Sequence, residues 1–478
     1  MVNPGLLLAS SGQSFQVKYL VFAATLFCGI PAVLALVLDR RLLGFAILGL
    51  VLPLLNFDGT AINLISMELY RGTARGMEIS LCYLVAIAII VAVTLRGGLK
   101  LRLPCMGSVL YFLYFMLSVC SLRHSGDRLI SFFELWKMIM MYVVFLAVSC
   151  YMEYTKGDFD VFEYGLGVFV VINLYFVLKQ HYFGNGVVYG VFPHKNSMAM
   201  FMALADIILF SVFMNTIKEK KSWLFLFLFS CGAVSSLRTY SRGGVVSLPM
   251  SILICFAISS FCQFRARKIL RFLLIFVVFV AGFLLFLPKI ILRFETAGEN
   301  SYLARVQFAT IARNIISDNK IFGIGINNWS RTLQQNRDYK INRQTNERMY
   351  LIRDGIVETI YLLVAAECGI PCLVALLLWF FYYFFLSLKL AYCLRDTKYF
   401  YFPAATAGGL LAIYLQSMLE WVLKQSINFI LLMIVYAMLS YLDRNWRQLV
   451  QREKEEKGQS SDASEDNISG GAHESALQ

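Results

Sequence analysis

Apolar runs of membrane-crossing length recur along almost the whole chain, from residue 19 to residue 443. A helix that crosses a hydrocarbon layer of about 30 Å needs about 20 mostly apolar residues. The sequence therefore predicts an all-α polytopic membrane protein with about 12–13 transmembrane helices and one large external loop. The predicted spans are 19–38, 42–56, 77–95, 104–122, 130–150, 160–179, 196–216, 222–237, 244–262, 269–288, 359–388, 403–422 and 426–443.

The composition supports this class. Of the 478 residues, 59% are hydrophobic and 15% are charged, whereas about a quarter of the residues in a soluble domain are charged. The net charge of +13 partly reflects basic residues that collect on the cytoplasmic face, so we expect no nucleic-acid partner. The eleven cysteines and four histidines form no CxxC pair and no His/Cys cluster, so we expect neither a metal nor another cofactor.

Short basic connections alternate with the other connections, and Lys and Arg mark the cytoplasmic face. The basic connections lie at 39–41, 96–102, 217–221, 263–271 and 389–398. This orientation places the N-terminus outside, or inside with twelve spans if the first run does not cross. The external loops are then 57–76, 123–129, 180–195, 238–243, 289–358 and 423–425.

This layout divides the chain into five segments. Residues 452–478 contain no aromatic and few aliphatic side chains, so we predict that the C-terminal tail is disordered. The segments are an N-terminal piece (1–18), ten helices (19–288), a large loop (289–358), three helices (359–443) and a cytoplasmic tail (444–478).

The external loops carry cations on the face where the topological bias disfavours them. Residues 238–244 are RTYSRGG, between two apolar runs, and the loop 289–358 contains further arginines. Any single one of these residues could simply solvate its loop. The set indicates a bound anion, because a guanidinium grips phosphate with paired donors. Cations of the other external loops include Arg71, Arg75, His194 and Lys195.

The loop 289–358 is by far the longest external connection, and loops of this length are usually functional or disordered. Its second half is polar, and we expect it to be flexible and able to hydrogen-bond a sugar. Its first half predicts an amphipathic helix at the membrane surface, ended by Asp318-Asn319, Gly323 and Gly325. The apolar positions of that helix are Val306, Ala309, Ile311, Ala312, Ile315 and Ile316.

Four motifs follow one another along the chain: GVFPHKNSMAMFMAL, SRGGVVSL, ARVQFATIARNIISDNKIFGIGINNW and ETIYLLVAAECGI. In this order they resemble the O-antigen ligase family, which includes polysaccharide polymerases and protein O-oligosaccharyltransferases. The resemblance covers roughly residues 60–440. It implies a multi-pass protein of the bacterial inner membrane with about twelve spans, both termini inside and a periplasmic active site.

The resemblance also implies an activity. Members transfer a glycan from undecaprenyl diphosphate to an acceptor hydroxyl without a metal or a nucleotide sugar. The implied partners are this lipid-linked donor, a glycan or lipid acceptor, membrane lipids and a chain-length regulator. The motifs point to Arg242 of SRGG, Arg305 before the amphipathic helix, and His194, Lys195 and Asn196 of HKN.

One position departs from the ligase pattern. In ligases, the helix that returns to the membrane commonly opens with a His-Asn pair, nine residues before a Glu-x-Gly. Glu367-Cys368-Gly369 supplies the second motif, but Glu358-Thr359 stands where the pair is expected. This difference slightly favours a polymerase over a ligase.

We expect the site to have three parts: cations for the lipid diphosphate, a base or orienting acceptor for the attacking hydroxyl, and a groove for the lipid tail. Burial is expected to raise the pKa of Glu358, which would suit a base. Plain structural roles compete with these functions: His194 could cap a helix, Arg242 could reach lipid headgroups, and Glu358 could complement a helix dipole. The catalytic candidates are Arg242, Arg305 and Glu358, and the binding candidates are His194, Lys195, Asn196, Arg238, Arg71 and Arg75.

Other hypotheses stay open at this point. Glu78 and Glu420 lie at the edges of spans, where they either serve a site or pair with a nearby basic residue. A transporter or flippase of lipid-linked glycans or a small anion would favour internal repeats and ionisable groups at the midplane. The two halves show no convincing repeat, and the cations gather at one face. A structural or sensory protein would explain neither the arginines nor the motif order.

Overall fold

We describe the chain from a computed structural model. The described residues are 61–67, 69–97, 105–184, 188–216, 219–264, 266–296, 299–351 and 355–474, with a few residues between 23 and 35. The predicted span 42–56 therefore lies outside the described residues, as does more than half of the span 19–38.

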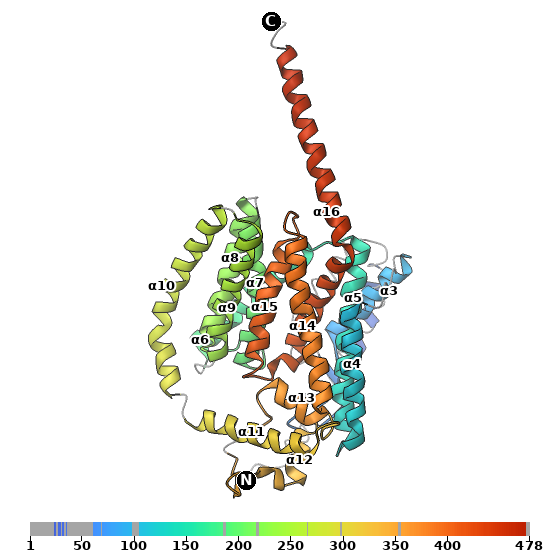
Figure 1. Ribbon diagram of the computed structural model, residues 1–478, viewed down its shortest axis with the longest axis vertical. Helices are drawn as coiled ribbons and strands as arrows, with labels where there is room; N and C mark the ends of the chain where they lie inside the picture. The colour runs from blue at the N-terminus through green and yellow to red at the C-terminus, as the bar shows by residue number, and fades with distance from the viewer. Residues whose placement is uncertain are drawn as a thin grey trace.

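A bundle of long helices forms the body of the protein (Figure 1). Seven helices in the described part of the chain are long and apolar enough to cross a membrane: α4 with the 3-10 turn that follows it, α5, α6, α7, α9, α14 and α16. The all-α polytopic class is thus confirmed. The bundle contains α3 (Leu81–Leu95), α4 (Met106–Cys120), α5 (Arg128–Thr155), α6 (Asp160–Phe183), α7 (Lys195–Asn215), α8 (Glu219–Arg238), α9 (Arg242–Cys262), α10 (Ala266–Thr296), α14 (Ile370–Cys393), α15 (Tyr401–Gln416) and α16 (Ser426–Glu474).

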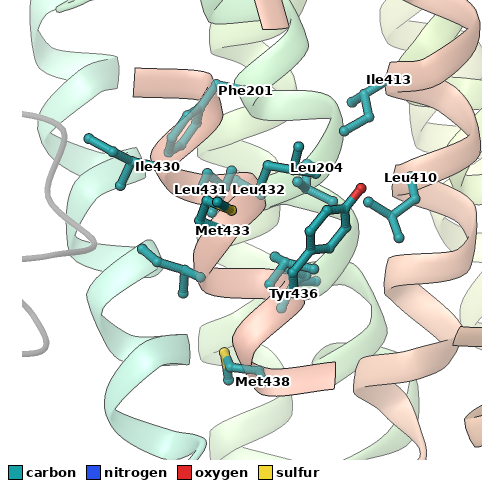
Figure 2. Packing of buried hydrophobic residues seen from close by; sticks show 14 of the residues in the cluster. Phe201, Leu204, Leu410, Ile413, Ile430, Leu431, Leu432, Met433, Tyr436 and Met438 are labelled. Atoms are coloured by element: carbon teal, nitrogen blue, oxygen red, sulfur yellow. The ribbon is translucent and has the colours of Figure 1, made fainter. Parts of the chain in front are cut away.

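The centre of the bundle is α7, which is buried along its whole candidate span and packs against α8, α9 and α15. Figure 2 shows side chains of α7, α15 and α16 interlocking in this core, among them Leu204, Leu410 and Leu432. Because lipid tails are apolar, no hydrophobic effect drives membrane helices together, and close packing of their backbones stabilises the association instead. At Gly408 of α15, for example, a Cβ would lie 2.6 Å from the carbonyl oxygen of Ser251 in α9.

The long loop folds across one end of the bundle. In Figure 1, α11 (Glu299–Asp318) runs crosswise to the bundle helices, next to α12 (Trp329–Gln335). The predicted amphipathic helix is confirmed, but Val306 is 44% exposed because the buried face follows a different i, i+4 row. The loop also contains the 3-10 turn η3 (Asp338–Lys340) and the hairpin β3 (Ile341–Asn342)–β4 (Glu347–Arg348). The buried face consists of Ala304, Phe308, Ile311, Ala312 and Ile315.

The predicted span 359–388 is wrong as one helix. It forms a short helix, α13 (Ile360–Cys368), and the longer α14, separated by Gly369 at φ +86°. The turn after α11 docks on this break through backbone hydrogen bonds, from Ile324 N to Ala366 O (3.1 Å) and from Ile370 N to Lys320 O (2.8 Å). The break therefore joins the loop to the bundle.

Gly369→Ala is expected to destabilise the protein. The backbone conformation disfavours any side chain by about 1–3 kcal/mol, and a Cβ would lie 2.0 Å from the carbonyl oxygen of Ile321. Thermal unfolding in detergent should show a lower Tm. The matched control is Gly126→Ala, whose Cβ would meet the end of the Gln335 side chain at 3.1 Å and the Oδ1 of Asn328 at 3.8 Å. Equal Tm values for the two variants would contradict a structural requirement at Gly369.

A small hairpin precedes the bundle. β1 (Ala61–Ser66) and β2 (Gly76–Ser80) pair antiparallel, and their connection reaches the long loop. The Asn327 side chain accepts from Thr73 N–H (2.8 Å) and donates to the Ala74 carbonyl (2.8 Å). The hairpin is thereby fixed to the loop, although the two are far apart in sequence.

The C-terminal tail differs from the prediction. Instead of being disordered from residue 444, it continues α16 as far as Glu474 and projects from the bundle (Figure 1). Residues 444–457 are rich in Arg, Gln, Glu and Lys, which have high helix propensity. Gln451 also donates to Glu455 over 3.0 Å, one turn away. Low hydrophobicity alone was therefore a poor guide here.

Candidate functional site

A cavity of about 570 Å³ lies where α7, α9, α11 and the connection between α15 and α16 meet. We call it the diphosphate cavity, after the donor group that the resemblance implies. Six of the nine predicted site residues line it: His194, Lys195, Asn196, Arg242, Arg305 and Glu358. They come from three separate stretches of sequence, so the fold brings the HKN motif, the SRGG motif and the long loop together.

Two long helices begin at this cavity, each with a cationic residue. α7 begins at Lys195 after its cap His194, whose Nδ1 accepts from the Asn196 N–H over 3.2 Å. α9 begins at Arg242 after its cap Ser241. A helix N-terminus carries partial positive charge and N–H groups without intrahelical partners. The electrostatics of the cavity therefore suit an anion.

Two carboxylates balance Arg305 at the same place. The Arg305 Nε forms an ion pair with Glu358, and Nη2 lies 3.2 Å from Glu420 Oε1. The Arg305 side chain is 30% exposed, so it remains accessible from the cavity. A guanidinium carries five N–H donors, and two carboxylates do not exhaust it. Arg305 can therefore keep acidic partners and still bind an anion.

A hydrogen-bond chain connects the two helix starts to Arg305. The Ser241 hydroxyl donates to Asn196 Oδ1 over 2.9 Å, and Asn196 Nδ2 donates to Glu420 Oε1 over 2.6 Å. Glu420 then contacts Arg305. Of the two alternatives for Glu420, pairing with a basic residue is confirmed, and that pairing lies in the cavity wall. The capping role of His194 is confirmed as well, while its binding role stays a prediction.

A buried cluster of ionisable residues lies beside the cavity. Lys424 of η4 (Val422–Lys424) is 3.2 Å from Glu134 Oε1 and 3.9 Å from Glu367 Oε2, and Lys137 is 2.7 Å from Glu134 Oε2. These side chains are at most 7% exposed. This cluster was not predicted from the sequence. The signal was present, because Glu and Lys inside the apolar run 130–150 are rare and usually paired.

Lys424→Met is expected to lower the Tm in detergent. Breaking a buried ion pair costs about 3–5 kcal/mol, and methionine retains the apolar stem. The cluster holds η4, whose neighbours Glu420 and Trp421 line the diphosphate cavity. Adding Glu367→Gln should recover part of the loss, because it removes a carboxylate left without its partner. A double variant no more stable than Lys424→Met would show that the two residues do not interact.

Three predicted site residues do not line the diphosphate cavity. Arg238 Nη1 contacts His181 Nε2 over 2.6 Å at the end of α8. The carbonyl of Arg71 accepts a hydrogen bond from the Ser330 hydroxyl. Arg75 lines a second, larger cavity, as does Glu78. Sequence reasoning grouped these residues by charge and side of the membrane, which does not fix their distance from one another.

Among the described residues, no group of three or more His, Cys, Asp or Glu side chains is arranged to hold a metal ion. The diphosphate cavity offers its cations, two carboxylates, and the hydroxyl and amide side chains named above.

Comparison with known proteins gave a match to this region. Residues 224–377 match the family model described as O-Antigen ligase. The matched segment runs from α8 to α14 and includes Arg242, Arg305 and Glu358. A comparison with curated proteins gave no match. The matched segment, about a third of the chain, is thus similar to the O-antigen ligase family.

Proposed function

We propose that the protein transfers a glycan from undecaprenyl diphosphate to an acceptor hydroxyl during polymerisation or ligation of a surface polysaccharide. The match of residues 224–377 to the O-antigen ligase family model supports the broader role, in surface polysaccharide assembly by a multi-pass membrane protein. One observation carries the specific proposal: Lys195, Arg242 and Arg305 meet at two helix N-termini in a single cavity with two carboxylates.

The cations act on the leaving group. As the bond between the anomeric carbon and the diphosphate oxygen breaks, negative charge grows on that oxygen. Lys195, Arg242 and Arg305 stabilise this charge with hydrogen bonds that are already oriented. The lipid tail leaves the cavity between helices toward the bilayer, and we place the cavity on the periplasmic side of the inner membrane.

Glu358 acts on the acceptor. In the structure without donor, its carboxylate pairs with Arg305. A diphosphate competes for the same guanidinium and so releases carboxylate oxygen for the attacking hydroxyl. The acceptor oxygen bonds to the anomeric carbon, and its proton passes to Glu358. Glu358 thus takes the place of the histidine expected in ligases, and the proposed transfer needs no metal.

The direct test is a transfer assay with the purified protein in liposomes, an undecaprenyl-diphosphate-linked glycan and an acceptor. The proposal expects a new glycosidic product. Lengthened lipid-linked chains indicate a polymerase, and a glycan on a separate acceptor indicates a ligase. If the glycan crosses the membrane with no new bond, the protein is a transporter and the proposal fails.

A further inference from the structure

A second cavity, of about 1030 Å³, lies beside the diphosphate cavity. Its walls come from the β1–β2 hairpin, α5, the end of α6, the connection to α7 and the start of α16. Trp421 and Gln425 line both cavities, so the two share one wall. A ligand bound in the second cavity would therefore lie next to a donor bound in the first.

The second cavity has the side chains of a carbohydrate site. Trp136, Trp421 and Tyr189 supply aromatic surface for the apolar faces of sugar rings. Asn63 and Arg75 supply polar groups for hydroxyls. Such a mixture of ring faces and a few polar groups matches a molecule that is polar at its edges and apolar on its faces.

Its charge differs from that of the diphosphate cavity. Arg75 and Glu78 both line the cavity and carry opposite charges, and Lys137 is compensated by its ion pair with Glu134. The N-termini of α7 and α9 line the other cavity, whereas the start of α16 lines this one. The second cavity is therefore less positive than the diphosphate cavity, which favours an uncharged oligosaccharide.

The walls are held in place before any ligand binds. The Trp136 indole donates to the Glu78 carbonyl over 2.8 Å, which attaches the hairpin to α5. The Thr73 hydroxyl donates to Glu134 over 2.7 Å, and Lys137 donates to the Thr73 carbonyl over 3.1 Å. Preorganised walls reduce the entropy lost on binding.

The shared wall offers a contact for the incoming hydroxyl. The Oε1 of Gln425 is buried and has no hydrogen-bond partner among the described residues. A buried carbonyl oxygen of this kind usually has a partner, and a sugar hydroxyl can provide one. The side chain is thus an acceptor at the boundary of the two cavities.

We propose that the second cavity binds the acceptor oligosaccharide and presents its attacking hydroxyl past Trp421 and Gln425 to the donor. This inference rests on the proposed function. It assigns to Arg75, which the sequence analysis grouped with the anion-binding residues, a place in the acceptor site. The acceptor and the donor then enter from neighbouring cavities and meet at Glu358.

The test uses the full-length protein in liposomes and, as acceptor probe, oligosaccharide released by mild acid from the surface polysaccharide of the source cells. We expect the double variant Asn63→Ala/Arg75→Ala to raise the acceptor KM by about tenfold or more, because lost hydrogen bonds to a charged group weaken binding on that scale. The donor KM and kcat should stay near wild type. Trp136→Phe is a second variant. It keeps an aromatic ring at the wall but removes the indole hydrogen bond to the Glu78 carbonyl, and it should also raise the acceptor KM.

Saturation-transfer NMR with the same oligosaccharide measures acceptor binding without catalysis. The matched control is Arg343→Ala, in the long loop and outside both cavities. An unchanged acceptor KM and unchanged NMR binding in both variants would overturn the inference, as would an equal rise in the donor KM. If wild type transfers nothing, the proposed function fails, and NMR binding that is lost only in the cavity variants still supports the cavity assignment.

Discussion

Arg305→Ala is expected to lower the rate of glycan transfer by about 10²–10³-fold, as loss of one charge-stabilising donor does in comparable sites. Arg305 contacts both carboxylates of the diphosphate cavity, and the proposal gives it the leaving diphosphate as well. Arg242→Ala, at the start of α9, is expected to act in the same direction. The measurement is the initial rate of product formation with saturating acceptor, at matched protein levels.

Arg305→Lys separates charge from geometry. Lysine keeps the positive charge but cannot make the paired contacts of a guanidinium, so we expect a rate between those of wild type and Arg305→Ala. The control is again Arg343→Ala, an exposed arginine of the same loop. The hydrogen bonds of Arg343 lower the pKa of Asp318 in the same loop. No role in the diphosphate cavity is proposed for Arg343. Wild-type transfer by Arg305→Ala and Arg242→Ala would exclude the role in diphosphate binding.

Glu358→Gln is expected to remove most turnover while donor binding is kept. Glutamine has almost the same shape but cannot take the hydroxyl proton, and general bases contribute about 10²–10⁴-fold. Single-turnover transfer with preloaded donor separates this step from binding. Glu347→Gln, on the exposed strand β4 of the same loop, is the matched control. Near-wild-type turnover in Glu358→Gln would mean that the base lies elsewhere or that none is needed.

Local patterns predicted the elements of the fold more readily than their contacts. The 3.6-residue period of α11 and the start of α9 after RTYS follow from neighbouring residues, which the sequence contains directly. The break at Gly369 was missed because its cause is the docked turn at Ile321, about fifty residues earlier. The helical tail was missed because composition was weighed above helix propensity.

For the candidate site too, the sequence predicted the local elements more readily than the contacts between them. The HKN and SRGG motifs each pointed to a cation at a helix start, but their meeting in one cavity depends on the packing of α7 against α9. Arg238 and Arg242 have the same charge and the same predicted side of the membrane. The sequence therefore did not show that Arg238 contacts His181 while Arg242 lines the diphosphate cavity. The partners of Lys424 come from α5 and α13. No pattern within one segment could show that cluster.

The most direct measurement of the central claim is binding of undecaprenyl diphosphate to the purified protein, by native mass spectrometry in detergent. Wild type, Arg343→Ala and the double variant Arg242→Ala/Arg305→Ala would be compared, with undecaprenyl monophosphate as a second ligand. We predict tight diphosphate binding by wild type and Arg343→Ala, weaker binding of the monophosphate, and loss of diphosphate binding in the double variant. Equal diphosphate binding by all three proteins would contradict the assignment of this cavity to the lipid diphosphate.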